Sequence, residues 1–113
     1  MSDLIIELNK GRKSRGIIQV MGNTYMTPGP RIHCKDGFSI SIQGSNTSYC
    51  SPRESLLDMK DYTELELGFP SEMDTLIEAY AEEEGTNDTV FPYVPVKVIE
   101  ALVAKHGGVR TET

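Results

Sequence analysis

The chain has 113 residues, a formal charge of −6, 38% apolar residues and 25% charged residues. A chain of this length can build one core, and this composition lies far from that of disordered chains. No apolar run reaches the roughly 18 to 20 residues of a membrane span, and the start does not follow the pattern of a secretory signal. The acidic balance argues against general nucleic-acid binding, which needs a basic face. We expect one cytoplasmic domain over residues 1–113.

The beginning of the chain has the composition of a β-hairpin followed by a loop. Residues 3–8 (DLIIEL) and 16–21 (GIIQVM) are rich in β-branched side chains, which favour strands. Residues 22–30 contain two glycines and two prolines, which predict a loop. Between the two expected strands lies a basic cluster of unassigned role, formed by Lys10, Arg12, Lys13 and Arg15.

A second hairpin is predicted over residues 31–43. Residues 31–34 (RIHC) form a short strand candidate, and residues 38–43 (FSISIQ) alternate apolar and polar side chains with a period of two. Asp36 and Gly37 stand between them, and an Asp-Gly pair favours a tight turn. The spacing therefore predicts that these two strands pair.

The rest of the chain predicts one more strand and two helices. Residues 44–60 are polar and read as a long loop, and residues 62–69 alternate as a strand. Apolar residues at helical spacing follow Ser71 and end at Gly85, which predicts a helix. Residues 86–95 are expected to be extended, and a last helix is expected from Pro95 to Gly107, followed by a loose tail. We expect an α+β fold, a mainly antiparallel sheet of about five strands with two helices.

Sequence motifs of the common enzyme classes are absent. The chain contains no GxSxG, HExxH, GxGxxG or phosphate-loop pattern. Cys34 and Cys50 are expected to be free thiols, and with His33 and His106 they lack the spacing of a zinc site. We therefore expect a binding protein without a metal or cofactor.

Two groups of residues have the chemistry of a nucleotide site. Arg53 can hold a phosphate through two hydrogen bonds, and Tyr49 offers a ring on which a base can stack. Asn87, Phe91 and Tyr93 combine an amide with two more rings. The alternative is that the aromatic rings pack into the fold, Arg53 is solvated and Asn87 caps a turn.

Four segments together resemble a known family. DGFSISIQ, YCSPR, YTELELGFPS and TVFPYVPVKVIEALVAKHGG, which cover most of residues 31–108, are similar to the bacteriophage anti-Thoeris sponge family. The resemblance implies an oligomeric protein that captures a cyclic ADP-ribose signal, or a related cyclic oligonucleotide, in the host cytoplasm without cleaving it. It adds Arg31 and Arg110 as phosphate-binding candidates.

Two other functions stay open. Six acidic residues between Glu72 and Glu84 would make the helix expected there acidic, and an acidic helix could inhibit a host defence or nucleic-acid-processing complex by occupying its basic surface. Glu64 and Glu66 share one face of a predicted strand, and two carboxylates could hold a metal ion or act in acid-base catalysis.

Overall fold

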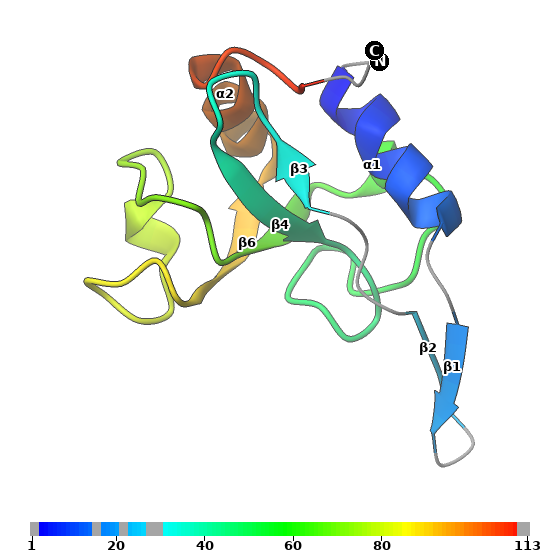
Figure 1. The fold of residues 1–113 in the computed structure, drawn as a ribbon. Helices are drawn as coiled ribbons and strands as arrows, with labels where there is room; N and C mark the ends of the chain where they lie inside the picture. The colour runs from blue at the N-terminus through cyan, green and yellow to red at the C-terminus, as the bar shows by residue number, and fades with distance from the viewer. Residues whose placement is uncertain (1–2, 15–16, 21–22, 27–30, 111–113) are drawn as a thin grey trace.

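A four-stranded antiparallel sheet forms the centre of the computed structural model, which describes residues 3–14, 17–20, 23–26 and 31–110. Its strands lie in the order β3, β4, β5, β6, so each strand pairs with its neighbour in the chain (Figure 1). The strands are Ile32–His33 (β3), Ser39–Gln43 (β4), Glu64–Gly68 (β5) and Val90–Pro95 (β6).

Two helices and a separate hairpin complete the fold. The α-helices are Asp3–Ser14 (α1) and Val96–Lys105 (α2), and short 3-10 helices cover Met59–Asp61 (η1) and Glu78–Tyr80 (η2). Strands Ile17–Val20 (β1) and Asn23–Met26 (β2) pair only with each other and extend away from the main sheet (Figure 1). No helix in the described part of the chain is long and apolar enough to cross a membrane. The predicted α+β class is confirmed, with a sheet of four strands and a hairpin of two where five strands were expected.

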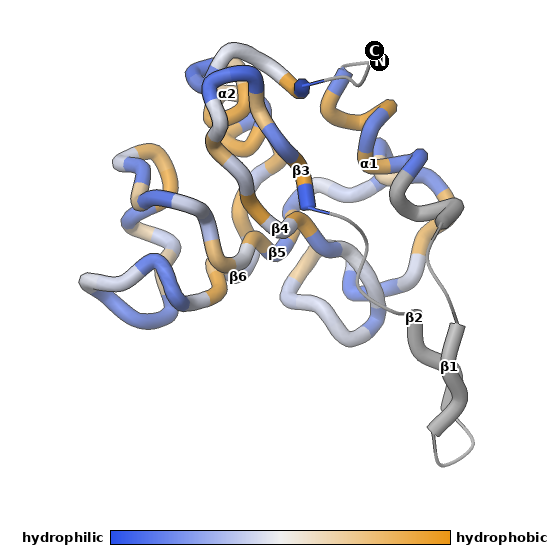
Figure 2. The backbone as a smooth tube through the Cα atoms, viewed as in Figure 1, coloured by the Kyte–Doolittle hydropathy of each residue, from blue (hydrophilic) through white to orange (hydrophobic). Residues whose placement is uncertain are grey.

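The core lies on the face of the sheet that carries the apolar residues of the alternating strands. Ile40 of β4, Leu65 and Leu67 of β5 are fully buried, as are Ile99 and Leu102 of α2. Each such side chain stabilises the fold by roughly 1.5–3 kcal/mol relative to leaving it in water. Figure 2 shows hydrophobic residues along β4 and β5 and in α2. The opposite face of β5 is left for Glu64 and Glu66.

The second predicted hairpin is confirmed. Ile32 pairs with Ile40 across β3 and β4, and the turn between the strands contains Gly37 at φ +99°, a conformation that favours glycine. The Phe38 N–H donates a 2.9 Å hydrogen bond to the Asp36 side chain, which closes the turn.

The predicted opening hairpin is wrong, because residues 3–8 belong to α1. Leu4, Ile5 and Leu8 are buried together in the core, and their spacing is that of one helix face. β1 pairs instead with β2, which lies inside the expected loop of residues 22–30. Residues 16, 21, 22 and 27–30 of those two predictions lie outside the described residues.

The helix predicted from Ser71 to Gly85 is also wrong, because tertiary contacts hold this segment in turns. The Ser71 N–H donates to the Ser39 carbonyl at 2.8 Å, and the Ser71 hydroxyl accepts from the Ser39 N–H at 2.9 Å. Asp74 is buried, and η2 is the only regular helical turn described here. Contacts with the sheet thus override a favourable helical pattern.

The C-terminal helix is confirmed, and the chain after it is less loose than predicted. Pro95 precedes α2, and Gly107 and Gly108 at φ near +90° end it. Val109 is buried and forms a β-bridge with Cys34. The chain around Val109 therefore lies antiparallel beside the end of β3, and residues 111–113 lie outside the described residues.

Candidate functional site

A β-bulge interrupts the pairing of β5 and β6. Leu65 pairs with Val94 and Leu67 pairs with Phe91, so that Glu66 faces two residues of β6, Pro92 and Tyr93. Bulges of this kind redirect a side chain and are frequent next to functional sites. Tyr93 has φ +53°, the left-handed conformation that a bulky residue rarely adopts.

The long loop after β4 folds back over this bulge. Ser51 forms a β-bridge with Glu64, its N–H donating to the Glu64 carbonyl at 3.0 Å. The Tyr49 N–H donates to Glu66 Oε1 at 3.1 Å, and the Tyr49 carbonyl accepts from the Tyr93 N–H at 3.0 Å. Tyr49 is therefore fixed by its backbone to both β5 and β6.

Two tyrosine rings and an arginine meet on the surface above these contacts. The rings of Tyr49 and Tyr93 lie 6.0 Å apart between centroids at an angle of 44°, and about 40% of each residue is exposed. The Arg53 Cζ lies 5.2 Å from the Tyr49 centroid, where a guanidinium is attracted by the ring face. We call Tyr49, Arg53, Glu66 and Tyr93 the aromatic site. It offers flat apolar surface and a mobile positive charge, the groups that bind a base and a phosphate.

Three of the seven predicted ligand-binding residues, Tyr49, Arg53 and Tyr93, are thus brought together. The prediction for Phe91 needs correction, because its ring is fully buried in the core and cannot contact a ligand on the surface. The other three lie in different contacts. Arg110 is exposed after the end of α2, where its N–H donates to the His33 carbonyl at 2.7 Å.

Arg31 and Asn87 hold the turn that follows β5. The Arg31 guanidinium donates to the Phe69 carbonyl at 2.6 Å and to the Ser39 hydroxyl at 3.2 Å. The Asn87 amide donates to the Pro70 carbonyl at 2.9 Å. These two side chains therefore hold two consecutive carbonyls, those of Phe69 and Pro70, and Phe69 is itself in the left-handed region.

An open groove lies beside that turn. It has a volume of about 1120 Å³ and is lined by residues between Ser71 and Asn87, including the carboxylates of Glu72, Glu78 and Glu84. The acidic segment noted in the sequence thus forms loops around a groove and not a helical face.

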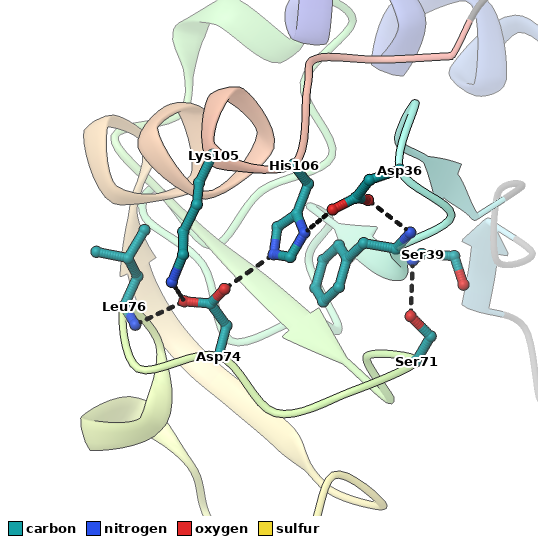
Figure 3. A network of polar contacts seen from close by, with 8 residues as sticks. Asp36, Ser39, Ser71, Asp74, Leu76, Lys105 and His106 are labelled. Atoms are coloured by element: carbon teal, nitrogen blue, oxygen red, sulfur yellow. Dashed lines mark hydrogen bonds and ion pairs between the residues drawn. The ribbon is translucent and has the colours of Figure 1, made fainter.

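A second polar cluster, which was not predicted from the sequence, joins the end of α2 to two loops (Figure 3). His106 Nδ1 lies 2.6 Å from Asp36 Oδ2, and His106 Nε2 lies 2.8 Å from Asp74 Oδ2. Lys105 Nζ donates to Asp74 Oδ1 at 3.1 Å, and the Phe38 ring stacks on the imidazole at 4.0 Å. Since these residues are up to 70 positions apart, no local spacing reveals the cluster.

The two aspartates favour the charged form of His106. Burial alone would lower the pKa of His106, but its hydrogen bonds to Asp36 and Asp74 outweigh burial and raise that pKa. Burial would likewise raise the pKa of Asp74, and its hydrogen bonds from Leu76, His106 and Lys105 instead lower it. Because both ring nitrogens already contact carboxylates, His106 in this arrangement has no nitrogen left to act on a substrate.

The carboxylates proposed as an alternative metal or acid-base pair are engaged within the protein. Glu64 Oε1 accepts from the Ser51 hydroxyl at 2.8 Å, and Glu66 Oε1 accepts from the Tyr49 N–H. Among the described residues no group of three or more His, Cys, Asp or Glu side chains could hold a metal ion. Cys34 and Cys50 are both buried, and the Cys50 thiol donates to the Ser45 carbonyl at 3.2 Å.

Comparison of the chain with protein-family models, with curated proteins and with solved structures found no match.

The left-handed backbone at Tyr93 predicts an unusual order of stabilities. A left-handed conformation costs a residue with a Cβ about 1–2 kcal/mol, and glycine avoids this cost. Tyr93→Gly should therefore be more stable than Tyr93→Ala by about 1 kcal/mol, whereas glycine in an ordinary strand is the less stable of the two. Urea unfolding of both variants measures the difference, and a more stable alanine variant would show that the backbone at residue 93 is ordinary.

The His106 cluster predicts a stability that depends on pH in both directions. Because the pKa of His106 is raised, His106 stabilises the fold at pH values below its usual pKa of about 6.5, and this stabilisation is lost as pH rises through the folded-state pKa. Because the pKa values of Asp36 and Asp74 are lowered, these residues stabilise the fold at pH values above about 4, and this stabilisation is lost as pH falls through their folded-state pKa values.

The free energy of unfolding should therefore be highest between about pH 4 and 6.5 and should decrease on either side. His106→Gln keeps polar groups near both aspartates but cannot gain a charge, so the decrease from pH 6 to 9 should be smaller in this variant. Urea unfolding from pH 3 to 9 measures both proteins. Parallel profiles above pH 6 would contradict the assignment of this limb to His106.

Proposed function

We propose that this protein binds a phosphorylated nucleotide signal at the aromatic site and sequesters it without cleaving it. The observation that carries the proposal is the fixed pair of exposed tyrosine rings with Arg53 beside them. Exposed aromatic rings that are held by the backbone lose little freedom when a ligand stacks on them. A flat base is the partner that such a surface fits best.

The positions of the three side chains indicate how the ligand enters. The two rings are tilted and in contact range, so a base does not fit between them as they stand. Arg53 covers one face of Tyr49. A base that takes the place of the guanidinium on this face releases Arg53, whose five donors are then available for the ligand's phosphate.

The resemblance to the anti-Thoeris sponge family supports a particular ligand class. It favours a cyclic ADP-ribose signal, with related cyclic oligonucleotides as further candidates, bound in the cytoplasm of a phage-infected host. The aromatic site lies on an open surface, so one copy of the chain covers only one side of a ligand. A second copy would enclose the other side, which is consistent with the oligomer that the resemblance implies.

The engagement of the candidate catalytic groups supports binding without cleavage. Glu64 is tied to Ser51, and His106 is tied to two aspartates on another element. Glu64 and His106 are therefore both engaged by groups of the protein itself. Sequestration needs only that the ligand binds the folded protein.

A second candidate function is supported by the groove between Ser71 and Asn87. Its three glutamates give it a negative rim, and none of them has an ion pair within the described part of the chain. A basic segment of a host protein would be a complementary partner. Such binding should weaken steeply as salt concentration rises, whereas stacking at the aromatic site should be less sensitive.

The experiment is thermal unfolding with cyclic ADP-ribose, cyclic di-AMP and cyclic di-GMP. A ligand at 100 times its Kd adds about 2.7 kcal/mol, which should raise the Tm by about 10 °C. Heating the complex should release the nucleotide intact. Arg53→Ala should weaken binding by about 10- to 100-fold, because a charge-assisted contact is lost.

Arg110→Ala is the matched control, since it removes the same charge from a different surface and should leave the affinity unchanged. If no nucleotide raises the Tm, or if both arginine variants lose affinity equally, the aromatic site is not a nucleotide site. Binding of a basic peptide that is lost in Glu72→Gln and Glu84→Gln would then favour the acidic groove.

A further inference from the structure

The aromatic site contains a carboxylate that is hydrogen-bonded to the backbone of Tyr49. Glu66 stands on the outer face of β5, beside Gln43 in the register of β4 and opposite the bulge residues Pro92 and Tyr93. It is half-buried, and its Oε1 accepts the Tyr49 N–H at 3.1 Å. The backbone of both neighbouring strands and of the loop thus fixes where this carboxylate lies.

This carboxylate retains capacity to accept further hydrogen bonds. A carboxylate has about four acceptor positions, and the Tyr49 N–H uses one of them. No ion pair in the described part of the chain includes Glu66. A ligand stacked on the tyrosine rings would therefore meet an anionic group that can accept but cannot donate.

We infer that Glu66 determines which base the aromatic site accepts, and that it selects a base with an amino group on its edge. The inference rests on the proposed function, since it assigns the ligand class of that same site. An amino group donates to the free acceptor positions of Glu66. A carbonyl at the same place has no hydrogen to donate and is repelled by the charge, so the amino group of adenine is favoured over the carbonyl group of hypoxanthine at the position that faces Glu66.

Glu66 also places the phosphate. A carboxylate beside the rings repels an anion, so the ligand's phosphate must lie on the side of Arg53 and the base edge on the side of Glu66. The two charged residues therefore orient the nucleotide in one direction. This polarity is absent from a site built only of tyrosine rings, which would accept any flat base.

The decisive comparison uses pairs of ligands in which a carbonyl group replaces the amino group of adenine. Titration calorimetry with AMP and IMP, and with cyclic ADP-ribose and its hypoxanthine analogue, gives the affinity ratio of each pair. The wild-type protein should bind the adenine member at least about tenfold more tightly. In Glu66→Gln the amide oxygen can still accept the Tyr49 N–H, while the amide nitrogen donates to the ligand. This variant should lose the preference for adenine or reverse it.

Glu64→Gln is the matched control, because it removes the same charge from the same strand face two residues away, where Glu64 contacts Ser51. It should keep the adenine preference. Equal affinity of the wild-type protein for both members of a pair overturns the role of Glu66 and leaves nucleotide binding intact. A preference that survives in Glu66→Gln, or that is lost equally in Glu64→Gln, also overturns it.

The wild-type ratio tests the inference even if Glu66→Gln does not fold. If the wild-type protein binds none of the four nucleotides, the proposed function and this inference fail together. A protein that binds both members of a pair equally, by contrast, contradicts the inference alone. The two failures are therefore distinguishable.

Discussion

The hydrogen bond from the Tyr93 N–H to the Tyr49 carbonyl is the contact on which the site depends. Tyr93 lies in the bulge opposite Glu66, and its N–H bonds to the loop that follows β4. The same bulge places Tyr93 in the left-handed region and directs its ring outward, where it meets Tyr49. The fold thus accepts local strain at a position where two aromatic rings are exposed, and such strain is frequent at functional sites.

The rest of the molecule provides a rigid base for this contact. The core of apolar side chains from β4, β5 and α2 lies on the opposite face of the sheet from Glu66. At the other end of the fold, His106 joins α2 to the β3–β4 turn through Asp36 and to the segment after β5 through Asp74. Because the His106 cluster and the aromatic site use separate loops, a substitution in one can be tested without disturbing the other.

Sequence reasoning predicted the elements whose pattern matches their surroundings. The alternation of residues 38–43, the Asp36-Gly37 turn and the apolar face of the last helix each coincide with a buried face or a turn in the structure. The helix predicted from Ser71 to Gly85 was wrong. Its apolar residues have helical spacing, but Ser71 and Asp74 form hydrogen bonds to residues distant in the sequence. The strand predicted over residues 3–8 was wrong because β-branched residues also occur in helices, and Leu4, Ile5 and Leu8 have the spacing of one buried helix face.

The residue types of the aromatic site could be predicted from the sequence, but their arrangement could be predicted only in part. Tyr49, Arg53 and Tyr93 were proposed from their residue types, and the structure brings them together. Glu66 belongs to the site because of the bulge in β6. The sequence does not reveal this bulge, because its residues are Pro92 and Tyr93 and it contains no glycine. Phe91 was misassigned because strand residues one or two apart look alike in sequence, while the bulge decides which of them faces outward.

The central claim is that a nucleotide binds on the rings of Tyr49 and Tyr93. It is tested most directly by an NMR titration of the tyrosine-labelled protein with cyclic ADP-ribose. The account predicts that the ring signals of these two tyrosines shift and show contacts to the base protons, while the buried Tyr62 is unaffected and the ligand is recovered unchanged. Ring signals of Tyr49 and Tyr93 that stay in place while residues of the groove between Ser71 and Asn87 shift would contradict it.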